Sequence, residues 1–307
     1  MGNEPLKVLC VTGWCRNGST ILGNVLNEVP GFFHVGELHF LWLNAAGKGS
    51  NNRCGCGAEL VRCPVWSSIL PLRRPAGNSP ADYADAVAGR QRACVRTRHT
   101  WRVLRRGLHC AEIREHAALM TAVYRAIADQ VGAQVIVDTT KIGGEAALLA
   151  HLPGVTPFYV HLVRDPRAVA QSWSREKDYA FTMPAWKSTA YWHGFNLASQ
   201  AITRSYPDRS MFLNYEDFIA DPAAAVDAAL RLCGADRGAN PVRDHRVDLA
   251  VNHTVTGNPD RFLSGNTVIR DTDDSWREAL PAHAKLTASV VAWPLLRRYG
   301  YQQAKRS

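Results

Sequence analysis

A glycine-rich loop near the N-terminus constrains the fold more than any other feature of the sequence. Residues 11–20 read VTGWCRNGST, so an apolar, strand-like run enters a glycine loop that opens directly into a helix. Backbone N–H groups and the helix N-terminus hold anionic oxygens in loops of this kind. Gly13 and Gly18 have the spacing of G-x-x-x-x-G-K-[ST]. Ser19 replaces the lysine, however, and Arg16 supplies a cation from inside the loop. We expect a phosphate site unsuited to ATP cleavage; the alternative is a glycine turn without a ligand.

Apolar runs alternate with helical patterns along the chain. The runs lie at residues 7–12, 135–137, 158–163 and 211–214, and the helical patterns that follow them at 18–28, 145–152, 166–176 and 222–232. Continuous apolar strands that alternate with helices are typical of a parallel sheet between two helix layers. We therefore predict an α/β fold, a three-layer sandwich with a central parallel sheet, that forms a single domain over residues 1–307.

One long segment has helical periodicity and no strand. Residues 81–130 contain no strand-like run, so we predict a helical insertion at 73–130 between two units of the sheet. Two further amphipathic helices are expected at 186–206 and 285–299.

The chain carries an excess of positive charge that is concentrated in the insertion. Lys and Arg number 36 against 27 Asp and Glu, a net charge of +9, in a composition that excludes disordered and collagen-like chains. Residues 73–106 hold nine arginines and two aspartates, which leaves +7. A nucleic-acid patch, a wall that attracts an anionic substrate and a solvated helix face all fit. Only Tyr83 and Trp101 are available there for stacking, which weakens the single-strand nucleic-acid interpretation.

Three of the eight cysteines are clustered. Cys54, Cys56 and Cys63 resemble part of a zinc knuckle, but no further ligand pair follows them, so we favour a structural turn or a disulfide and expect no metal. The sequence begins without a secretory pattern and has no apolar run of the ~18 residues that a membrane span needs. We therefore expect a cytoplasmic protein without a membrane span.

A second anion-binding motif follows the predicted strand at 158–163. The sequence RDPRAVAQS places Asp165 as a helix N-cap and Pro166 at the first helical position. Seven residues are about two helical turns, so Ser172 lies on the face of Asp165 and near the loop that holds Arg164. A guanidinium and a hydroxyl presented together can bind a phosphate. In the alternative, Arg164 pairs with Asp165 or another neighbour and Ser172 faces solvent.

Together, these motifs resemble the sulfotransferases that use 3′-phosphoadenosine 5′-phosphosulfate (PAPS). In that family a loop similar to PRSGTT binds the 5′-phosphosulfate, and an Arg eight residues before a Ser binds the 3′-phosphate. The matching residues here are Arg16, Asn17, Gly18, Ser19 and Thr20 for the first motif, and Arg164 and Ser172 for the second. The resemblance implies a P-loop NTPase-like sulfotransferase fold with two anion sites at opposite ends of the sheet, PAPS as donor and adenosine 3′,5′-bisphosphate (PAP) as product.

Two later segments extend the resemblance. NYEDFIADP places Tyr215 where the family has a residue near the adenine. HTVTGNPDRF is similar to a Gly-Asn-rich loop that closes over the cofactor in bacterial members, which assigns Gly257, Asn258 and Arg261 to cofactor binding. Ile21 and Leu22 stand where many members have the aromatic side chain that stacks on adenine.

The resemblance also assigns the catalytic residues. HVGELHF places Glu37 near the position of the base in the tyrosylprotein-type branch, and His39 is the second choice because small-phenol enzymes use a histidine. Arg16 is expected to favour the ionised form of Glu37. Lys141, in VIVDTTK, resembles the lysine that stabilises the transferring sulfuryl group together with Arg16. Asp138 would instead order Mg²⁺ in a P-loop kinase.

The function expected from these residues is sulfuryl transfer from PAPS to a hydroxyl of a small-molecule or carbohydrate acceptor. The insertion at 73–130 and the helix at 186–206 are expected to face the acceptor. The charge of +7 predicts that the acceptor has an anionic group, and we expect no nucleic-acid partner. A P-loop kinase-like phosphotransferase and a non-catalytic nucleotide- or RNA-binding protein are the alternatives.

Overall fold

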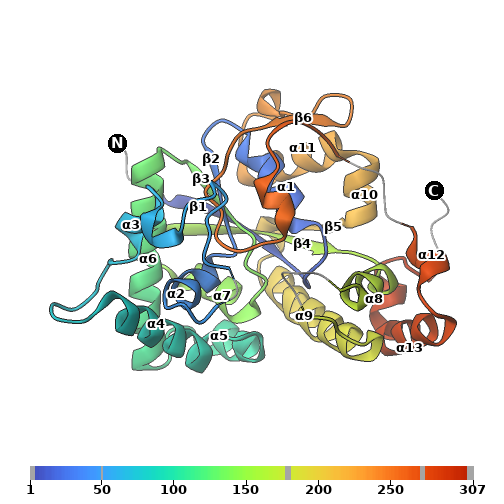
Figure 1. Ribbon diagram of the computed structural model, residues 1–307, viewed down its shortest axis with the longest axis horizontal. Coiled ribbons are helices and arrows are strands. Elements are labelled where there is room, and N and C mark those ends of the chain that lie inside the picture. The colour runs from blue at the N-terminus through green and yellow to red at the C-terminus, as the bar shows by residue number, and fades with distance from the viewer. Residues whose placement is uncertain (1–3, 50, 177–180, 270–273, 303–307) are drawn as a thin grey trace.

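A five-stranded parallel sheet forms the centre of the molecule in the computed structural model, which describes residues 4–49, 51–176, 181–269 and 274–302 (Figure 1). The strands are β1 (Leu6–Thr12), β2 (Phe32–Gly36), β3 (Val135–Asp138), β4 (Val155–Val163) and β5 (Ser210–Asn214). Their order is β2-β3-β1-β4-β5, and each neighbouring pair is parallel. The predicted fold class is confirmed.

Helices cover both faces of the sheet. They are α1 (Ser19–Asn27), α2 (Leu41–Ala45), α3 (Trp66–Ile69), α4 (Pro80–Cys94), α5 (Thr100–Arg106), α6 (Ala111–Val131), α7 (Gly143–Leu148), α8 (Pro166–Ser174), α9 (Ala185–Ser205), α10 (Tyr215–Ala220), α11 (Pro222–Cys233), α12 (Trp276–Ala279) and α13 (Ala282–Arg298). Short 3-10 turns are η1 (Leu38–Phe40), η2 (Leu60–Arg62), η3 (Thr97–His99), η4 (Leu149–His151), η5 (Pro207–Arg209), η6 (Arg237–Ala239) and η7 (Pro259–Phe262).

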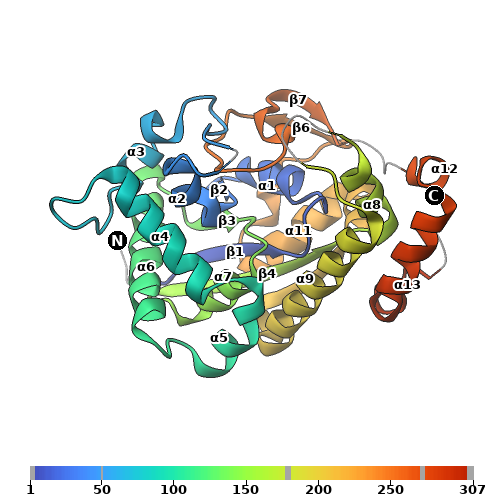
Figure 2. The same ribbon diagram turned by 60° about the horizontal axis from the view of Figure 1, so that its bottom comes forward.

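The alternation of side chains along β1 divides the core into two layers. Val8 and Cys10 pack with α6 and α7 on one face, and Leu9 and Val11 pack with α1 and α11 on the other. Helices α12 and α13 lie at the end of the molecule opposite α3 and α4 (Figures 1 and 2). No helix within the described ranges is long and apolar enough to cross a membrane.

The local signals for helix boundaries are reproduced in the structure. Asp165 caps α8 by accepting from the backbone N–H of Arg167 at 2.8 Å, and Asp221 caps α11 by accepting from Ala224 at 2.9 Å. Both helices carry proline in the first turn, where no N–H donor is needed.

Three strands were not predicted from the sequence. β2 is only five residues long and contains the buried polar residue His34, whose ring nitrogens lie 3.3 Å from Asn24 Oδ1 and from Thr139 Oγ1. The other two, β6 (Arg246–Leu249) and β7 (Gly265–Val268), form an antiparallel hairpin outside the main sheet. Helices α4, α5 and α6 occupy the chain between β2 and β3.

Candidate active site

The carboxyl ends of the five strands present the candidate residues in a row. Across the sheet, β2 is followed by Glu37, β3 by Lys141, β1 by the loop 13–18, β4 by Arg164 and β5 by Tyr215. All five strands end at the same edge because they are parallel, and neighbouring strands are about 4.8 Å apart, so the row spans about 19 Å. Ligands of open α/β sheets bind at this edge.

The glycine loop between β1 and α1 is held in a left-handed conformation at three positions. Gly13, Arg16 and Gly18 have φ values of 132°, 71° and 88°. The buried side chain of Asn17 donates to the carbonyl of Leu162 in β4 at 2.8 Å and accepts from the N–H of Ser19 at 3.3 Å. Asn17 therefore fixes the loop against β4. The loop leads into the N-terminus of α1, where the first N–H groups of the helix have no acceptor within the helix.

The two anion motifs lie next to each other, and the expectation that they occupy opposite ends of the sheet is wrong. β1 and β4 are neighbours, with Thr12 paired to His161, so the loops that follow them meet. Arg164 Nη1 donates to the carbonyl of Arg16 at 3.3 Å. The Arg164 guanidinium also lies 4.5 Å from the centroid of the Tyr215 ring.

Gly18 allows the glycine loop to approach Tyr215 closely. A Cβ atom at position 18 would lie 2.3 Å from the ring of Tyr215, and the φ of 88° is one that residues with side chains rarely adopt. The tyrosine that the resemblance places near the adenine therefore packs directly on the glycine loop.

Arg164 is not neutralised by the adjacent aspartate. The Asp165 carboxylate pairs with Arg167 at 2.6 Å. Ser172 is half-buried on the last turns of α8, seven residues after the N-cap. The structure thus removes the alternative in which Asp165 is the partner of Arg164.

Glu37 and Lys141 form an ion pair beside the loop. Lys141 Nζ lies 2.6 Å from Glu37 Oε1 and also donates to the carbonyl of Thr139 at 3.0 Å. Burial by itself lowers the pKa of Lys141, but the Glu37 carboxylate outweighs it, so the pKa lies above its ordinary value. Lys141 is thus a cation in direct contact with Glu37. The expectation that Arg16 favours the ionised form of Glu37 stays a prediction.

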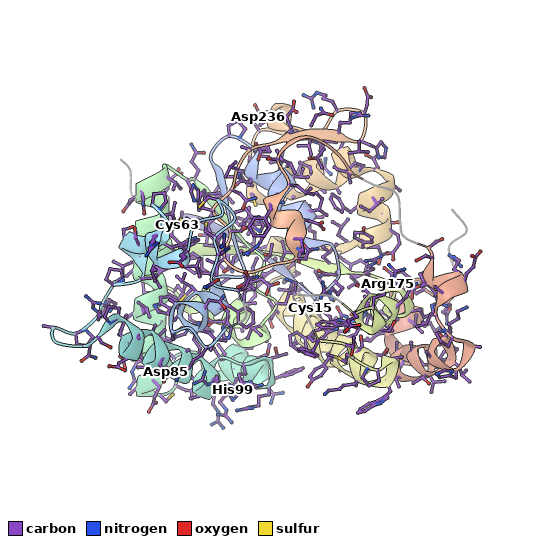
Figure 3. The ribbon with its side chains drawn as sticks, viewed as in Figure 1. Cys15, Cys63, Asp85, His99, Arg175 and Asp236 are labelled. Carbon is purple, nitrogen blue, oxygen red and sulfur yellow. The ribbon has the colours of Figure 1, made fainter. Side chains whose placement is uncertain are left out.

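Cys15 of the glycine loop lies near the centre of the molecule in the view of Figure 3. Burial raises the pKa of its thiol to about 11, and the charges of Lys141, Glu37 and Arg16 act on it as well. These four residues therefore share one environment, to which β1, β2 and β3 all contribute.

His39, the second candidate base, belongs to a different network. Its Nδ1 lies 2.9 Å from Glu145 Oε1, and His116 Nε2 lies 3.0 Å from the same oxygen. Gln91 donates to that oxygen at 3.1 Å. Burial alone would raise the pKa of Glu145, but His116 and His39 hold it well below its ordinary value. Glu37, not His39, is the candidate in contact with the site's lysine.

The loop 252–261 packs on α1 and brings a buried cation to the site. Gly257 lies beside Thr20, and Asn24 Nδ2 donates to the carbonyl of Asp260 at 2.9 Å. Arg261 is 2% exposed; its Nη2 donates to Asn51 Oδ1, whereas Nε and Nη1 have no hydrogen-bond partner among the described residues. Asn258 Oδ1 is likewise without a partner there. A buried guanidinium with two unused donors fits an anionic ligand, such as PAPS.

Both carboxylate oxygens of Asp138 accept hydrogen bonds from neighbouring residues. Tyr124 donates its hydroxyl to Oδ2 at 2.6 Å, and the N–H of Thr140 donates to Oδ1 at 2.7 Å. Burial raises the pKa of this carboxyl. These contacts favour a structural role for Asp138 over the kinase role.

An apolar cavity of about 380 Å³ opens beside this edge of the sheet. Its lining includes Ile142, which follows Lys141, together with side chains from the segment 96–101 and from α9. Trp14 of the glycine loop connects the cavity to the site, since its ring lies 5.2 Å from Tyr191 and 4.5 Å from Phe195, both in the cavity wall.

The clustered cysteines acquire a fourth neighbour. The potential ligand atoms of Cys54, Cys56, Cys63 and His253 all lie within 4.8 Å of one another. No ligand pair follows the cysteines in the sequence, and the structure instead brings the single residue His253 to them. His253 is a single residue 190 positions after Cys63, so no short-range spacing could have identified it.

A parallel α/β sheet whose carboxyl edge carries a glycine anion loop, a second arginine motif and a carboxylate–lysine pair defines a group-transfer enzyme of the sulfotransferase class. The sequence profile described as "Sulfotransferase family" matches residues 9–237, and the chain belongs to this family. No curated protein matches the chain significantly.

Two solved domains share its fold. The sulfotransferase domain of the Synechococcus PCC 7002 olefin synthase is 20% identical, with a TM-score of 0.52, and 95% of each chain is covered. A sulfotransferase domain from the curacin biosynthetic pathway is 16% identical, with a TM-score of 0.56 and coverage of 95% of this chain and 97% of that one.

Proposed function

We propose that this protein transfers a sulfuryl group from PAPS to a hydroxyl of a small-molecule or carbohydrate acceptor. The observation that carries the proposal is the order of groups along the sheet edge. A carboxylate–lysine pair lies at one side, the glycine loop in the middle, and Arg164 with Tyr215 at the other. This order matches a donor whose sulfate end and nucleoside end must be held in one extended site.

The residues divide by the part of the donor that they would hold. Arg16, Gly18, Ser19 and Thr20, at the N-terminus of α1, suit the 5′-phosphosulfate. Arg164 and Ser172 suit the 3′-phosphate, and Tyr215 suits the adenine side. Gly257, Asn258 and Arg261 approach from the loop over α1, and the unused donors of the buried Arg261 suit an anionic oxygen.

The donor supplies a sulfuryl group activated by attachment to a phosphate. Glu37 accepts the proton of the acceptor hydroxyl, and we assign this to Oε2 because Oε1 accepts from Lys141. Lys141 donates to the Glu37 carboxylate and places a positive charge where negative charge develops during transfer. The burial of both side chains, 15% and 5% exposed, strengthens these interactions relative to water.

The cavity beside the site indicates what kind of acceptor fits. Its wall includes the apolar side chains Trp101, Phe195 and Leu197, and the exposed Arg96 and Arg98 also line it. We propose an acceptor with an apolar or aromatic body and an anionic group. Replacing Arg96 and Arg98 with alanine should raise the acceptor KM and weaken its salt dependence. Arg105 and Arg106, exposed on α5 outside that lining, provide the charge-matched control.

Thermal unfolding with different ligands distinguishes the candidate functions. Stabilisation by PAP without Mg²⁺ supports the sulfotransferase, since a ligand that binds only the folded state raises its stability. A response confined to Mg-ATP would support the kinase, and a response confined to RNA would support the binding protein. Incubation of PAPS with a panel of phenols, sugars and glycosylated metabolites, followed by mass spectrometry, then identifies the acceptor.

A further inference from the structure

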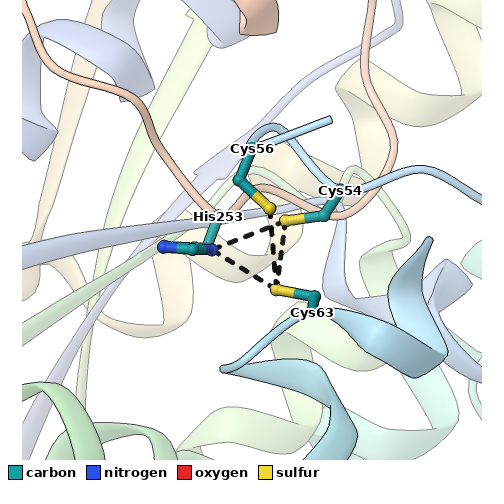
Figure 4. A group of neighbouring side chains, drawn as sticks. All are labelled: Cys54, Cys56, Cys63 and His253. Carbon is teal, nitrogen blue, oxygen red and sulfur yellow. Dashed lines mark hydrogen bonds between the residues drawn. The ribbon is translucent and has the colours of Figure 1, made fainter. Parts of the chain in front are cut away.

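We propose that Cys54, Cys56, Cys63 and His253 form a structural zinc site. Three sulfur atoms and one imidazole nitrogen converge from two segments that are far apart in the sequence (Figure 4). Cysteine and histidine are the preferred zinc ligands, and three cysteines with one histidine make a closed, four-ligand site. The function of the enzyme assigns no role to this cluster.

Four of the six distances between these atoms are close to the edges of a tetrahedral zinc site, and all six are within 4.8 Å. Zinc–sulfur bonds of about 2.3 Å and zinc–nitrogen bonds of about 2.0 Å imply edges of roughly 3.8 Å between sulfurs and roughly 3.5 Å between sulfur and nitrogen. The sulfur of Cys63 lies 3.5 Å from that of Cys54 and 3.9 Å from that of Cys56. His253 Nδ1 lies 3.7 Å from the Cys54 sulfur and 3.3 Å from the Cys63 sulfur.

The backbone around the cluster is held by its own hydrogen bonds. The N–H of Cys54 donates to Ala58 at 2.8 Å, and its carbonyl accepts from Gly57 at 2.9 Å, so the chain makes a tight turn between the first two sulfurs. The carbonyl of His253 accepts from the indole of the fully buried Trp66 at 2.8 Å. Cys54 and Cys63 are also fully buried. The ligand positions are thus fixed by structure on both sides of the cluster.

The site would tie the loop 252–261 to the segment 54–63, and this loop also lies against the end of β2, which Glu37 follows. Two residues after His253, the N–H of Val255 donates to the carbonyl of Val35 at 2.9 Å, and the carbonyl of Val255 accepts from the N–H of Glu37 at 2.8 Å. Gly36 permits this approach, because a Cβ at that position would lie 2.3 Å from the Val255 oxygen. An ion at the cluster would therefore fix the backbone of the candidate base and the start of the loop that carries Arg261.

Metal analysis of the purified full chain tests the proposal without any nucleotide or activity assay. We expect about one zinc per chain after extensive dialysis, and less than about a fifth of that in Cys63→Ser and His253→Gln. Cys94→Ser removes a buried cysteine outside the cluster and should keep its zinc. Chains that hold little zinc, with the three thiols free or with any two joined in a disulfide by mass spectrometry, would overturn the proposal.

Two measurements on the wild-type chain keep the test valid if the variants do not fold. The X-ray absorption spectrum at the zinc edge should fit three sulfurs and one nitrogen, whereas an all-nitrogen or all-oxygen shell would refute the assignment. After chelation, hydrogen exchange should accelerate at the amides of Val255 and Glu37 and stay unchanged between β4 and β5. Unchanged exchange at Val255 and Glu37 would refute the anchoring role. Failure of PAP to bind would refute the proposed function and leave this result intact.

Discussion

Lys141 Nζ lies 2.6 Å from Glu37 Oε1, and the two side chains come from the ends of neighbouring strands β3 and β2. The pair joins a proton acceptor to a cation on one side of the glycine loop. The groups that suit the nucleoside end of the donor, Arg164 after β4 and Tyr215 after β5, lie on the opposite side of the loop.

Glu37→Gln keeps the shape of the side chain and removes its ability to accept a proton. We expect kcat to fall by about 10²–10⁴-fold, the usual contribution of a general base, and PAP affinity to change little. Steady-state kinetics and calorimetric titration with PAP measure the two quantities. His39→Gln is the comparison, and we expect it to lower the melting temperature but to keep kcat within about tenfold of wild type. The reverse ranking of the two variants would assign the base to His39.

Arg261→Met should affect the free and the bound protein in opposite ways. Two donors of the buried guanidinium are unused, so its loss should leave the melting temperature of the free protein unchanged or raise it. The stabilisation by saturating PAP should shrink, by about 1.4 kcal/mol for each tenfold loss of affinity. Arg246→Met, an exposed change on β6, controls for loss of charge. An undiminished PAP response would remove Arg261 from the site.

Arg164→Gln tests the assignment of the 3′-phosphate. A charge-assisted bond to a phosphate contributes about 1.5–3 kcal/mol, so affinity for PAP should fall by roughly 10–100-fold. Adenosine 5′-monophosphate lacks the 3′-phosphate, and its affinity should change by less than about threefold. Calorimetric titrations with both nucleotides make the comparison. Equal losses for the two would place Arg164 at another part of the nucleotide.

The parts of the site that depend on local chain order could be predicted from the sequence. A strand, a glycine loop and a helix are adjacent in the chain. Arg164 is likewise followed directly by Asp165, which caps α8, and by α8 itself. Residues within a few positions of one another form these parts of the site, so the spacing of the motif residues along the chain is enough to predict them. The pairing of Glu37 with Lys141 depends on the position of β2 in the sheet. This strand could not be recognised from the sequence, because it is short and contains the buried polar residue His34.

Contacts between segments that are far apart in the chain could not be predicted from the sequence. The adjacency of the two anion motifs follows from the order of strands in the sheet, which no local pattern contains. The approach of His253 to Cys63 depends on a loop that leaves the sheet and returns to β2. A single histidine among eleven carries no periodicity that could assign it to the cysteines.

Stability should fall as the pH decreases from 7 to 5. Burial lowers the pKa of His34 to about 3 and that of His161 to about 4. Below an unfolded pKa of about 6.5 the unfolded chain takes up a proton at each position and the folded chain does not, which costs about 2 kcal/mol per histidine at pH 5. The elevated pKa of Lys141 acts only in alkaline solution, and the depressed pKa of Glu145 only below about pH 4.5.

Urea unfolding at pH 7 and pH 5 measures this change. His161→Gln should reduce the difference between the two pH values by about 2 kcal/mol, even if it destabilises the protein at both. A wild-type chain equally stable at both pH values would contradict the neutral, buried state of these histidines.

The most direct test of the account measures whether PAPS is converted to PAP together with sulfation of an acceptor. The reaction is run without Mg²⁺ with wild type and with Glu37→Gln, and mass spectrometry quantifies both products. We predict that the wild-type chain forms equal amounts of PAP and sulfated acceptor. Glu37→Gln, still binding PAP, should form both products at least about a hundredfold more slowly. Sulfation by Glu37→Gln at the wild-type rate, or a wild-type chain that binds PAPS no more tightly than adenosine 5′-monophosphate, would contradict the account.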